Sequence, residues 1–194
     1  MLETSPHPSR ARTERAPVVV ATARFASPVG ELAAFTHQGA LCALSFISGR
    51  YDPLAVLRAR LGTIEAREGD PLDVAGRFRD YFRGELEALH SLPVETGGTA
   101  FQRRVWEALR TIPVGTTLSY LALAQRVGAP DAVRAVGAAN GANPVAIVLP
   151  CHRVIGSNGR LVGYGGGLDR KRWLLAHERA PITPAAAAQA RLFQ

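Results

Sequence analysis

A cysteine stands next to a histidine in the segment from Leu149 to Val154, which reads Leu-Pro-Cys-His-Arg-Val. The thiolate is the nucleophilic form of cysteine, and a neighbouring histidine or positive charge raises the thiolate fraction. Cys151 is followed directly by His152 and Arg153, and Pro150 restricts the backbone just before it. These residue types in this order predict a reactive thiol that attacks an electrophilic atom.

Other interpretations of Cys151 stay open from the residues alone. A free cysteine is most often a small buried apolar residue, and we expect this of Cys42, which lies in an apolar segment. We expect no metal site, because Cys151 and His152 are adjacent and no second pair has ligand spacing. A thiol protease or hydrolase would pair the cysteine with a distant histidine, and His37, His90 and His177 are available for this.

The composition favours a folded protein of the reducing cytoplasm. The chain has 194 residues, of which 47% are hydrophobic and 20% charged, and its two cysteines make no disulfide framework. The first 16 residues are polar, so we expect a disordered N-terminus rather than a signal peptide. We also expect no membrane partner, because no run approaches the roughly 20 apolar residues that a membrane helix needs.

The positive charge is concentrated in one half of the chain. The formal net charge is +7, yet residues 1–94 hold 11 basic and 11 acidic side chains. Residues 95–180 hold 11 basic against five acidic ones, and this is the half that contains Cys151. A localised basic surface is typical of nucleic-acid binding, with a solvated arginine-rich surface as the alternative.

The first half of the chain alternates between predicted strands and helices. Hydrophobic patterning predicts strands over 18–25, 31–36 and 41–47. Pro53 can open a helix that runs to about Leu61, and helical spacing of apolar residues predicts a second helix over 71–85. Residues 93–98 contain Pro93 and two glycines, so they are the expected linker between a domain of residues 17–92 and one of residues 99–180.

The second half is predicted to be mainly helical. Thr99 and Gln102 match a capping box that begins a helix through Ile112, and Ser119 can cap a short helix that ends near Gly128. We expect Asp131 to cap a third helix through Asn140, with Gly141 just beyond it. Two short helices joined by a glycine turn predict a helix-turn-helix. A last amphipathic helix is expected over 169–179, with three large apolar side chains facing inward: Trp173, Leu174 and Leu175.

Several motifs together resemble those of the O6-alkylguanine-DNA alkyltransferases, also called methylated-DNA–protein-cysteine methyltransferases. In order and spacing these are Asn143-Pro144, Pro150 to Val154, Gly163-Tyr164 and Leu174 to Glu178. The resemblance covers roughly residues 18–180 and is densest from Phe101 onward. It implies an α/β protein, with an N-terminal ribonuclease-H-like domain and a C-terminal winged-helix or helix-turn-helix domain that binds DNA.

The resemblance also implies a reaction. Cys151 would attack the alkyl carbon of O6-alkylguanine, or of O4-alkylthymine, and keep the alkyl group, so that the protein acts once without a cofactor. His152 would take the thiol proton through a water, and Glu178 would orient the imidazole. Tyr120 would support proton delivery to the leaving guanine, and Asn143 would brace the turn that presents the thiol.

The same resemblance assigns residues to DNA and base binding. Arg134 would enter the duplex and fill the gap left by the flipped nucleotide, beside the small residues Ala135 and Gly137, and Tyr120 would lie near the target phosphate. The alkylguanine would be held by four residues: Val148, Cys151, Tyr164 and Gly165. We expect a monomer in solution that binds double-stranded DNA containing O6-alkylguanine, with cooperative binding along DNA as a further possibility.

The sequence departs from the family pattern in places. Gly165 stands where some relatives have a serine, so a contact there would come from the backbone alone. Zinc-binding residues of some relatives are missing, since Cys42 is the only cysteine of the first half. Residues 181–194 form a Pro/Ala tail outside the resemblance.

Two alternative functions stay open. One is a lesion-binding sensor without chemistry, which the presence of Cys151 disfavours, and the other is a thiol hydrolase.

Overall fold

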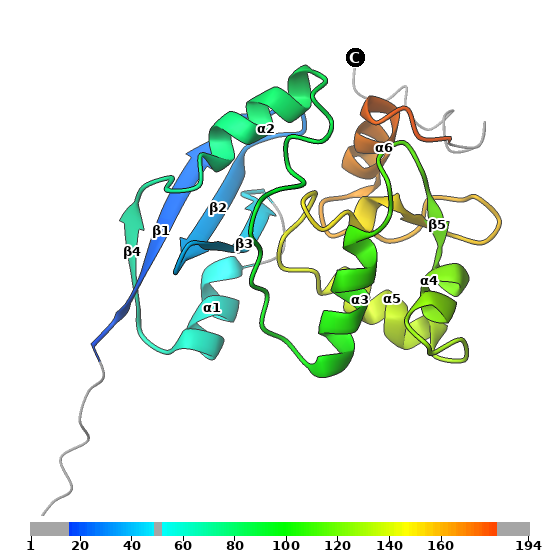
Figure 1. The fold of residues 1–194 in the computed structure, drawn as a ribbon, viewed down its shortest axis with the longest axis horizontal. Helices are drawn as coiled ribbons and strands as arrows, with labels where there is room; N and C mark the ends of the chain where they lie inside the picture. Colours follow the sequence, from blue (N-terminus) through cyan, green and yellow to red (C-terminus); the bar gives the residue numbers. More distant parts are fainter. Residues whose placement is uncertain (1–15, 49–51, 182–194) are drawn as a thin grey trace, which may run out of the picture.

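A four-stranded sheet forms the first half of the molecule (Figure 1). The computed structural model describes residues 16–48 and 52–181, so the N-terminal stretch and nearly all of the C-terminal tail considered above lie outside the described residues. The strand order is β3-β2-β1-β4, in which β1 to β3 are antiparallel neighbours and β4 runs parallel to β1. The strands are β1 (Val18–Phe25), β2 (Leu32–His37), β3 (Ala40–Phe46) and β4 (Ile64–Glu68).

Two helices cover opposite faces of this sheet. Helix α1 (Pro53–Leu61) buries Leu57 against one face, together with Phe35 and Cys42. Helix α2 (Val74–Arg83) buries Phe78 and Tyr81 in the main core on the other face. Because successive side chains of a strand point to opposite faces, β2 and β3 contribute to both clusters.

The structure corrects two expectations in this half. Helix α2 begins at Val74 rather than Pro71, because the Asp70 carboxylate accepts hydrogen bonds from Val74 N and Ala75 N at 2.7 and 2.8 Å and thereby starts the helix later. Strand β4 was not expected from the sequence. Four of its five residues are exposed, so it is an edge strand without the apolar alternation that predicts strands.

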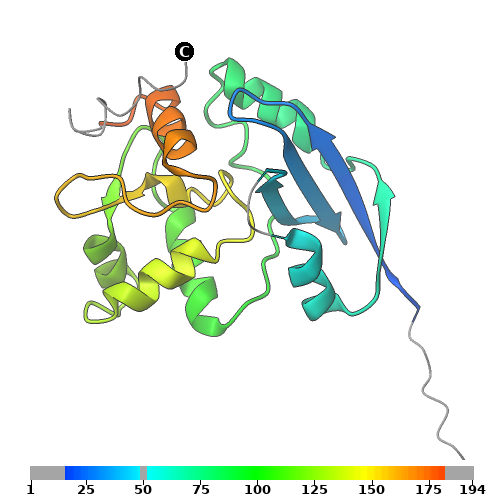
Figure 2. The same cartoon turned by 180° about the vertical axis from the view of Figure 1, so that it is seen from behind.

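Four helices and a small two-stranded sheet form the second half, which lies beside the large sheet when seen from either side (Figures 1 and 2). The capping box expected at Thr99 begins the first of these helices. Strands β5 (Leu118–Ser119) and β6 (Val154–Ile155) pair in parallel, and a short 3₁₀ helix (Cys151–Arg153) precedes β6. The remaining elements are α3 (Ala100–Arg110), α4 (Tyr120–Arg126), α5 (Val133–Gly141) and α6 (Leu168–His177).

Two expectations in this half were wrong. Asp131 does not cap α5: a turn closed by the bond from Ala132 N to Ala129 O precedes the helix, which starts at Val133 with Ala132 as its cap and includes Gly141. Trp173 does not face inward, since 36% of it is exposed. Its ring stacks on His177 at 5.0 Å and covers the outside of an aromatic cluster.

The two halves share one core. The main buried cluster contains residues of β2 and β3, of α2, and of α3 to α6. The expected linker is hydrogen-bonded along β3, where Leu41 N donates to Pro93 O at 2.8 Å and Glu95 N donates to Leu41 O at 3.0 Å. The large sheet is therefore held directly against the half that contains Cys151.

Candidate active site

The chain reaches Cys151 through a series of tight turns. Val148 N donates to Ala146 O at 2.8 Å, and Cys151 N donates to Leu149 O at 2.7 Å. Ile147, at the centre of the first of these turns, has a φ of 70°, a left-handed conformation that is strained for a β-branched residue. Strained backbone persists where surrounding contacts determine it, so the fold holds this loop in one defined shape.

Asn143 supplies part of that restraint. Its Nδ2 donates to Leu149 O at 2.7 Å, and its Oδ1 accepts from Val145 N at 3.0 Å. The amide therefore bridges both ends of the loop that leads to the cysteine. The resemblance implies that Asn143 braces this turn, and these two hydrogen bonds are the contacts through which it would do so.

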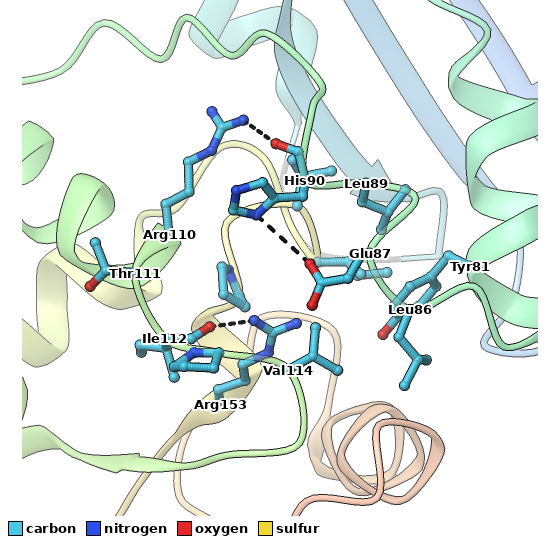
Figure 3. Close-up of a pocket in the computed structure, with 14 residues that line it drawn as sticks. Tyr81, Leu86, Glu87, Leu89, His90, Arg110, Thr111, Ile112, Val114 and Arg153 are labelled. Carbon is cyan, nitrogen blue, oxygen red and sulfur yellow. Dashed lines mark hydrogen bonds and ion pairs between the residues drawn. The ribbon is translucent and has the colours of Figure 1, made fainter.

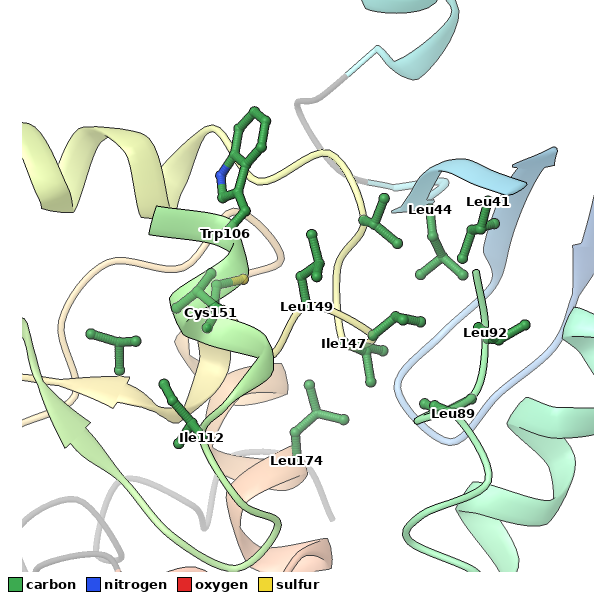
Figure 4. Close-up of a cluster of buried hydrophobic side chains, with 14 of the residues drawn as sticks. Leu41, Leu44, Leu89, Leu92, Trp106, Ile112, Ile147, Leu149, Cys151 and Leu174 are labelled. Atoms are coloured by element: carbon green, nitrogen blue, oxygen red, sulfur yellow. The ribbon is translucent and has the colours of Figure 1, made fainter. Parts of the chain in front are cut away.

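Cys151 lies at a cavity of 310 Å³ and is 7% exposed. Figure 4 shows it within the buried cluster that also contains Leu149 and Leu174. Burial raises the pKa of the Cys151 thiol, whereas the Asn143 side chain and the Lys171 charge act in the opposite direction. The cavity is lined by Leu44, Ser45, Phe46, Tyr120, Gly137, Asn140, Gly141, Asn143, Ala146, Cys151, Gly163, Tyr164, Gly165 and Gly166.

His152 and Glu178, to which the resemblance gives a joint role, are hydrogen-bonded to each other. His152 Nε2 lies 3.1 Å from Glu178 Oε1, and both side chains are fully buried. The same carboxylate accepts from Arg153 Nε and Nη2, each at 2.8 Å, and from the Tyr81 hydroxyl at 2.8 Å. Glu178 is thus the centre of a buried network to which α2 of the first half contributes.

The network sets the protonation states of its members. Burial lowers the pKa of His152, although Glu178 opposes this, so the imidazole is neutral near pH 7 and its Nε2–H donates to the carboxylate. Burial disfavours the charged form of Glu178, but the hydrogen bonds from His152 and Arg153 outweigh it and hold the pKa of Glu178 well below its usual range. His152 Nδ1 is buried without a hydrogen-bond partner among the described residues, so it is free to accept a proton.

Lys171 is a site residue that the sequence reasoning missed. It is fully buried in α6, and its Nζ donates to Val154 O, Val162 O and Gly163 O at 2.7, 2.8 and 3.1 Å. Burial lowers the pKa of Lys171 to about 8, while the charge of Cys151 opposes this shift. A signal was present in the composition, because Lys171 is the only lysine of a chain that otherwise uses arginine.

Lys171→Met is expected to move the ionisation of Cys151 to higher pH. The ammonium group favours the thiolate, so removing its charge raises the pKa of the thiol. The measurement is the rate of Cys151 alkylation by iodoacetamide against pH, followed by peptide mapping to separate Cys151 from Cys42. Lys171→Arg retains the charge and serves as the control. A profile of the Met variant that coincides with the wild type would contradict this role of Lys171.

The other residues expected at the site lie around the same cavity or beside it. Tyr120 is presented by the start of α4, where Ser119 caps the helix, and its hydroxyl accepts from Asn140 Nδ2 at 3.5 Å. Gly137 lies on α5 next to the Tyr120 ring, and Arg134 and Ala135 lie on the exposed side of that helix. Tyr164 and Gly165 line the cavity from the loop before α6.

Val148 is not among the residues that line the Cys151 cavity, and the role that the resemblance implies for it belongs to its backbone carbonyl. It lines a second cavity of 270 Å³, together with residues of α2 and of the end of α3. Figure 3 shows this cavity with Tyr81, Arg110 and Arg153 around it. Arg153 also borders this cavity, where its Nη1 donates to Ile112 O at 2.5 Å. The second cavity therefore gives access to the back of the Glu178 network rather than to the thiol.

Three distant histidines of the described residues lie away from the thiol. His37 Nδ1 lies 3.0 Å from Val19 O in the large sheet, His90 is exposed, and His177 Nε2 lies 2.8 Å from Tyr81 O. None of the three lines the Cys151 cavity. Within residues 16–48 and 52–181, no group of three or more His, Cys, Asp or Glu could hold a metal ion, and no helix is long and apolar enough to cross a membrane.

Comparisons with known proteins identify similar sequences and a similar fold. Residues 100–180 match the family model of the 6-O-methylguanine DNA methyltransferase DNA-binding domain. A methylated-DNA–protein-cysteine methyltransferase of Mycolicibacterium paratuberculosis is 48% identical over 156 residues, which is 79% of this chain and 88% of the relative. One of Shigella flexneri is 56% identical over 109 residues, which is 56% of this chain and 64% of that relative.

A solved structure of a related protein has a similar fold. Mycobacterium tuberculosis OGT in complex with DNA superposes with a TM-score of 0.72 and 42% identity, covering 84% of this chain and 96% of the other. The similarity therefore extends over the large sheet as well as over the half that contains Cys151.

Proposed function

The chain belongs to the methylated-DNA–protein-cysteine methyltransferase family, and we propose that it repairs DNA by transferring the alkyl group of O6-alkylguanine to its own Cys151. O4-alkylthymine is a second candidate substrate. The observation that carries the proposal is the cavity thiol next to a buried, neutral His152 that hydrogen-bonds the Glu178 carboxylate. This arrangement provides a nucleophile, a base and a group that orients the base.

The proposed reaction is a single displacement. The Cys151 sulfur attacks the alkyl carbon, an S–C bond forms, and the C–O6 bond breaks with its electron pair leaving on the guanine. The thiol proton passes through a water to His152 Nδ1, and Glu178 stabilises the resulting imidazolium. The thioether product does not regenerate the thiol, so each molecule reacts once, and the displacement requires no cofactor.

In this proposal the residues around the thiol protonate and hold the guanine. Burial raises the pKa of the Tyr120 phenol, so it is protonated near neutral pH and can support proton delivery to the departing guanine. Asn143 braces the loop, Tyr164 packs over the base, and Gly165 offers backbone contacts. The carbonyls of Val148 and Cys151 would accept from the exocyclic amine of the base.

We propose that α4 and α5 form the DNA-binding helix-turn-helix of a winged-helix-like domain, and that the large sheet is a ribonuclease-H-like domain. The antiparallel order of β1 to β3, with β4 parallel to β1, supports the latter. Arg134 would fill the space of the flipped nucleotide while Ala135 and Gly137 allow close approach to the groove. The partner is double-stranded DNA that contains O6-alkylguanine, bound by a monomer in the cytoplasm.

Intact-mass measurement tests the function. Protein mixed with a duplex that contains O6-methylguanine is expected to gain one methyl group in place of the thiol hydrogen, and peptide mapping should locate it on Cys151. Tight binding of the lesion without a mass change would instead indicate a sensor. Turnover of an acyl substrate without alkylation would indicate a thiol hydrolase.

Arg134→Ala is expected to weaken repair of a paired lesion much more than reaction with the free base. The side chain holds the gap that base flipping leaves, and flipping costs a few kcal/mol. The measurement compares transfer rates from duplex O6-methylguanine and from free O6-benzylguanine. Arg103→Ala, on α3, removes a basic side chain outside the cavity and is the control. Equal loss on both substrates would contradict the proposed role.

A further inference from the structure

Strand β3 of the large sheet forms one wall of the Cys151 cavity. Its last three residues, Leu44, Ser45 and Phe46, line the cavity together with the thiol. The strand is joined to the active-site loop by backbone hydrogen bonds, from Leu44 N to Pro144 O at 2.9 Å and from Ala146 N to Leu44 O at 3.0 Å. This wall is therefore fixed relative to Cys151 even though it comes from the other half of the chain.

The Phe46 ring is held firmly in that wall. It is 4% exposed, and the Arg170 guanidinium lies over it at 4.5 Å from the ring centroid. The Tyr164 ring meets it edge-on, with centroids 6.2 Å apart. A Cβ on Gly166 would lie 2.5 Å from Phe46, so the chain comes as close to the ring as glycine allows.

Arg170 ties this wall to the loop on the other side of the cavity. Its Nε donates to Val29 O at 2.6 Å and its Nη2 to Ser48 Oγ at 2.8 Å, both in the large-sheet half. Its Nη1 donates to Gly166 O at 2.9 Å, in the loop that carries Tyr164. One guanidinium thus keeps the Phe46 wall and the Tyr164 loop at a constant separation.

We infer that Phe46 is a specificity-determining residue that limits the size of the alkyl group that Cys151 can accept. This inference rests on the proposed alkyl transfer. A cavity of 310 Å³ must hold the flipped guanine together with its substituent, and a wall clamped by Arg170 and Gly166 cannot retreat from a large one. Tight apolar walls discriminate between substituents by their volume.

The test compares two duplexes of the same sequence that contain O6-methylguanine or O6-benzylguanine. The quantity measured is the ratio of the benzyl to the methyl transfer rate constant. Phe46→Leu enlarges the cavity and is expected to raise this ratio roughly ten-fold, and Phe46→Trp, which reduces the cavity, is expected to lower it by a similar factor. General destabilisation would change this ratio in the same direction in both variants. Opposite changes therefore identify an effect of the side-chain volume at position 46.

Phe35→Leu is the matched control. Phe35 is also buried in the large sheet, at 6% exposure, but it faces α1 on the opposite side, so its ratio should equal that of the wild type. An unchanged ratio in both Phe46 variants, with normal methyl transfer, would overturn the inference and leave the proposed function intact. Absence of methyl transfer by the wild type would overturn the proposed function itself.

Discussion

Cys151→Ser is expected to abolish alkyl transfer while the protein still binds a duplex that contains O6-methylguanine. A serine hydroxyl is almost never ionised near neutral pH, so it lacks the nucleophilic form that the thiol reaches with help from Lys171 and Asn143. The substitution leaves the shape of the cavity and the His152–Glu178 pair unchanged. Intact-mass spectrometry should detect no adduct, and fluorescence anisotropy should give an affinity close to that of the wild type.

Cys42→Ser is the control for this experiment. Cys42 lies on the α1 side of the large sheet, its Sγ donates to Phe35 O at 3.1 Å, and burial raises the pKa of its thiol. The serine variant can make the same hydrogen bond and should accept one alkyl group as the wild type does. An adduct on the Cys151→Ser protein, or loss of the adduct in the Cys42→Ser protein, would show that the acceptor is not Cys151.

The parts of the site that could be predicted lie close together in the sequence or carry a local signal. The Pro-Cys-His-Arg segment predicts a reactive thiol, and the capping box at Thr99 and the cap at Ser119 locate two of the helices around it. These features depend on hydrogen bonds within a few residues, so sequence patterns report them well. The same reasoning failed at Asp131, where a preceding turn shifted the helix start beyond the reach of its side chain.

The parts that could not be predicted depend on contacts between distant segments. Phe46 and Tyr81 read as ordinary core residues of the first half, and only the pairing of β3 with the segment at Pro144 and the packing of α2 on α6 bring them to the site. Arg153 was visible in the motif, but its hydrogen bonds to a carboxylate 25 residues later were not. Lys171 differs from these, since its uniqueness as a lysine could have drawn attention to it.

Glu178→Ala is expected to have the largest effect on stability of any single change considered. Glu178 is 2% exposed and accepts hydrogen bonds from Tyr81, His152 and Arg153. Removing one partner of a buried ion pair leaves the other charge uncompensated and typically costs about 3–5 kcal/mol. Urea denaturation at pH 7 measures the loss in the free energy of unfolding. Glu87→Gln removes a surface carboxylate, 73% exposed, and should stay within about 0.5 kcal/mol of the wild type.

Glu178→Gln separates the charge from the packing. The amide keeps the volume, but it cannot stabilise an imidazolium on His152 as a carboxylate does, so the transfer rate should fall by about a hundred-fold. The folded pKa of Glu178 lies below its unfolded value, so its stabilisation is complete above about pH 4.3 and is lost as the pH falls further. The stability difference between the wild type and Glu178→Gln should therefore be largest near pH 7 and shrink in acid. A difference that stays constant from pH 7 to pH 3 would mean that the carboxylate charge does not hold this network together.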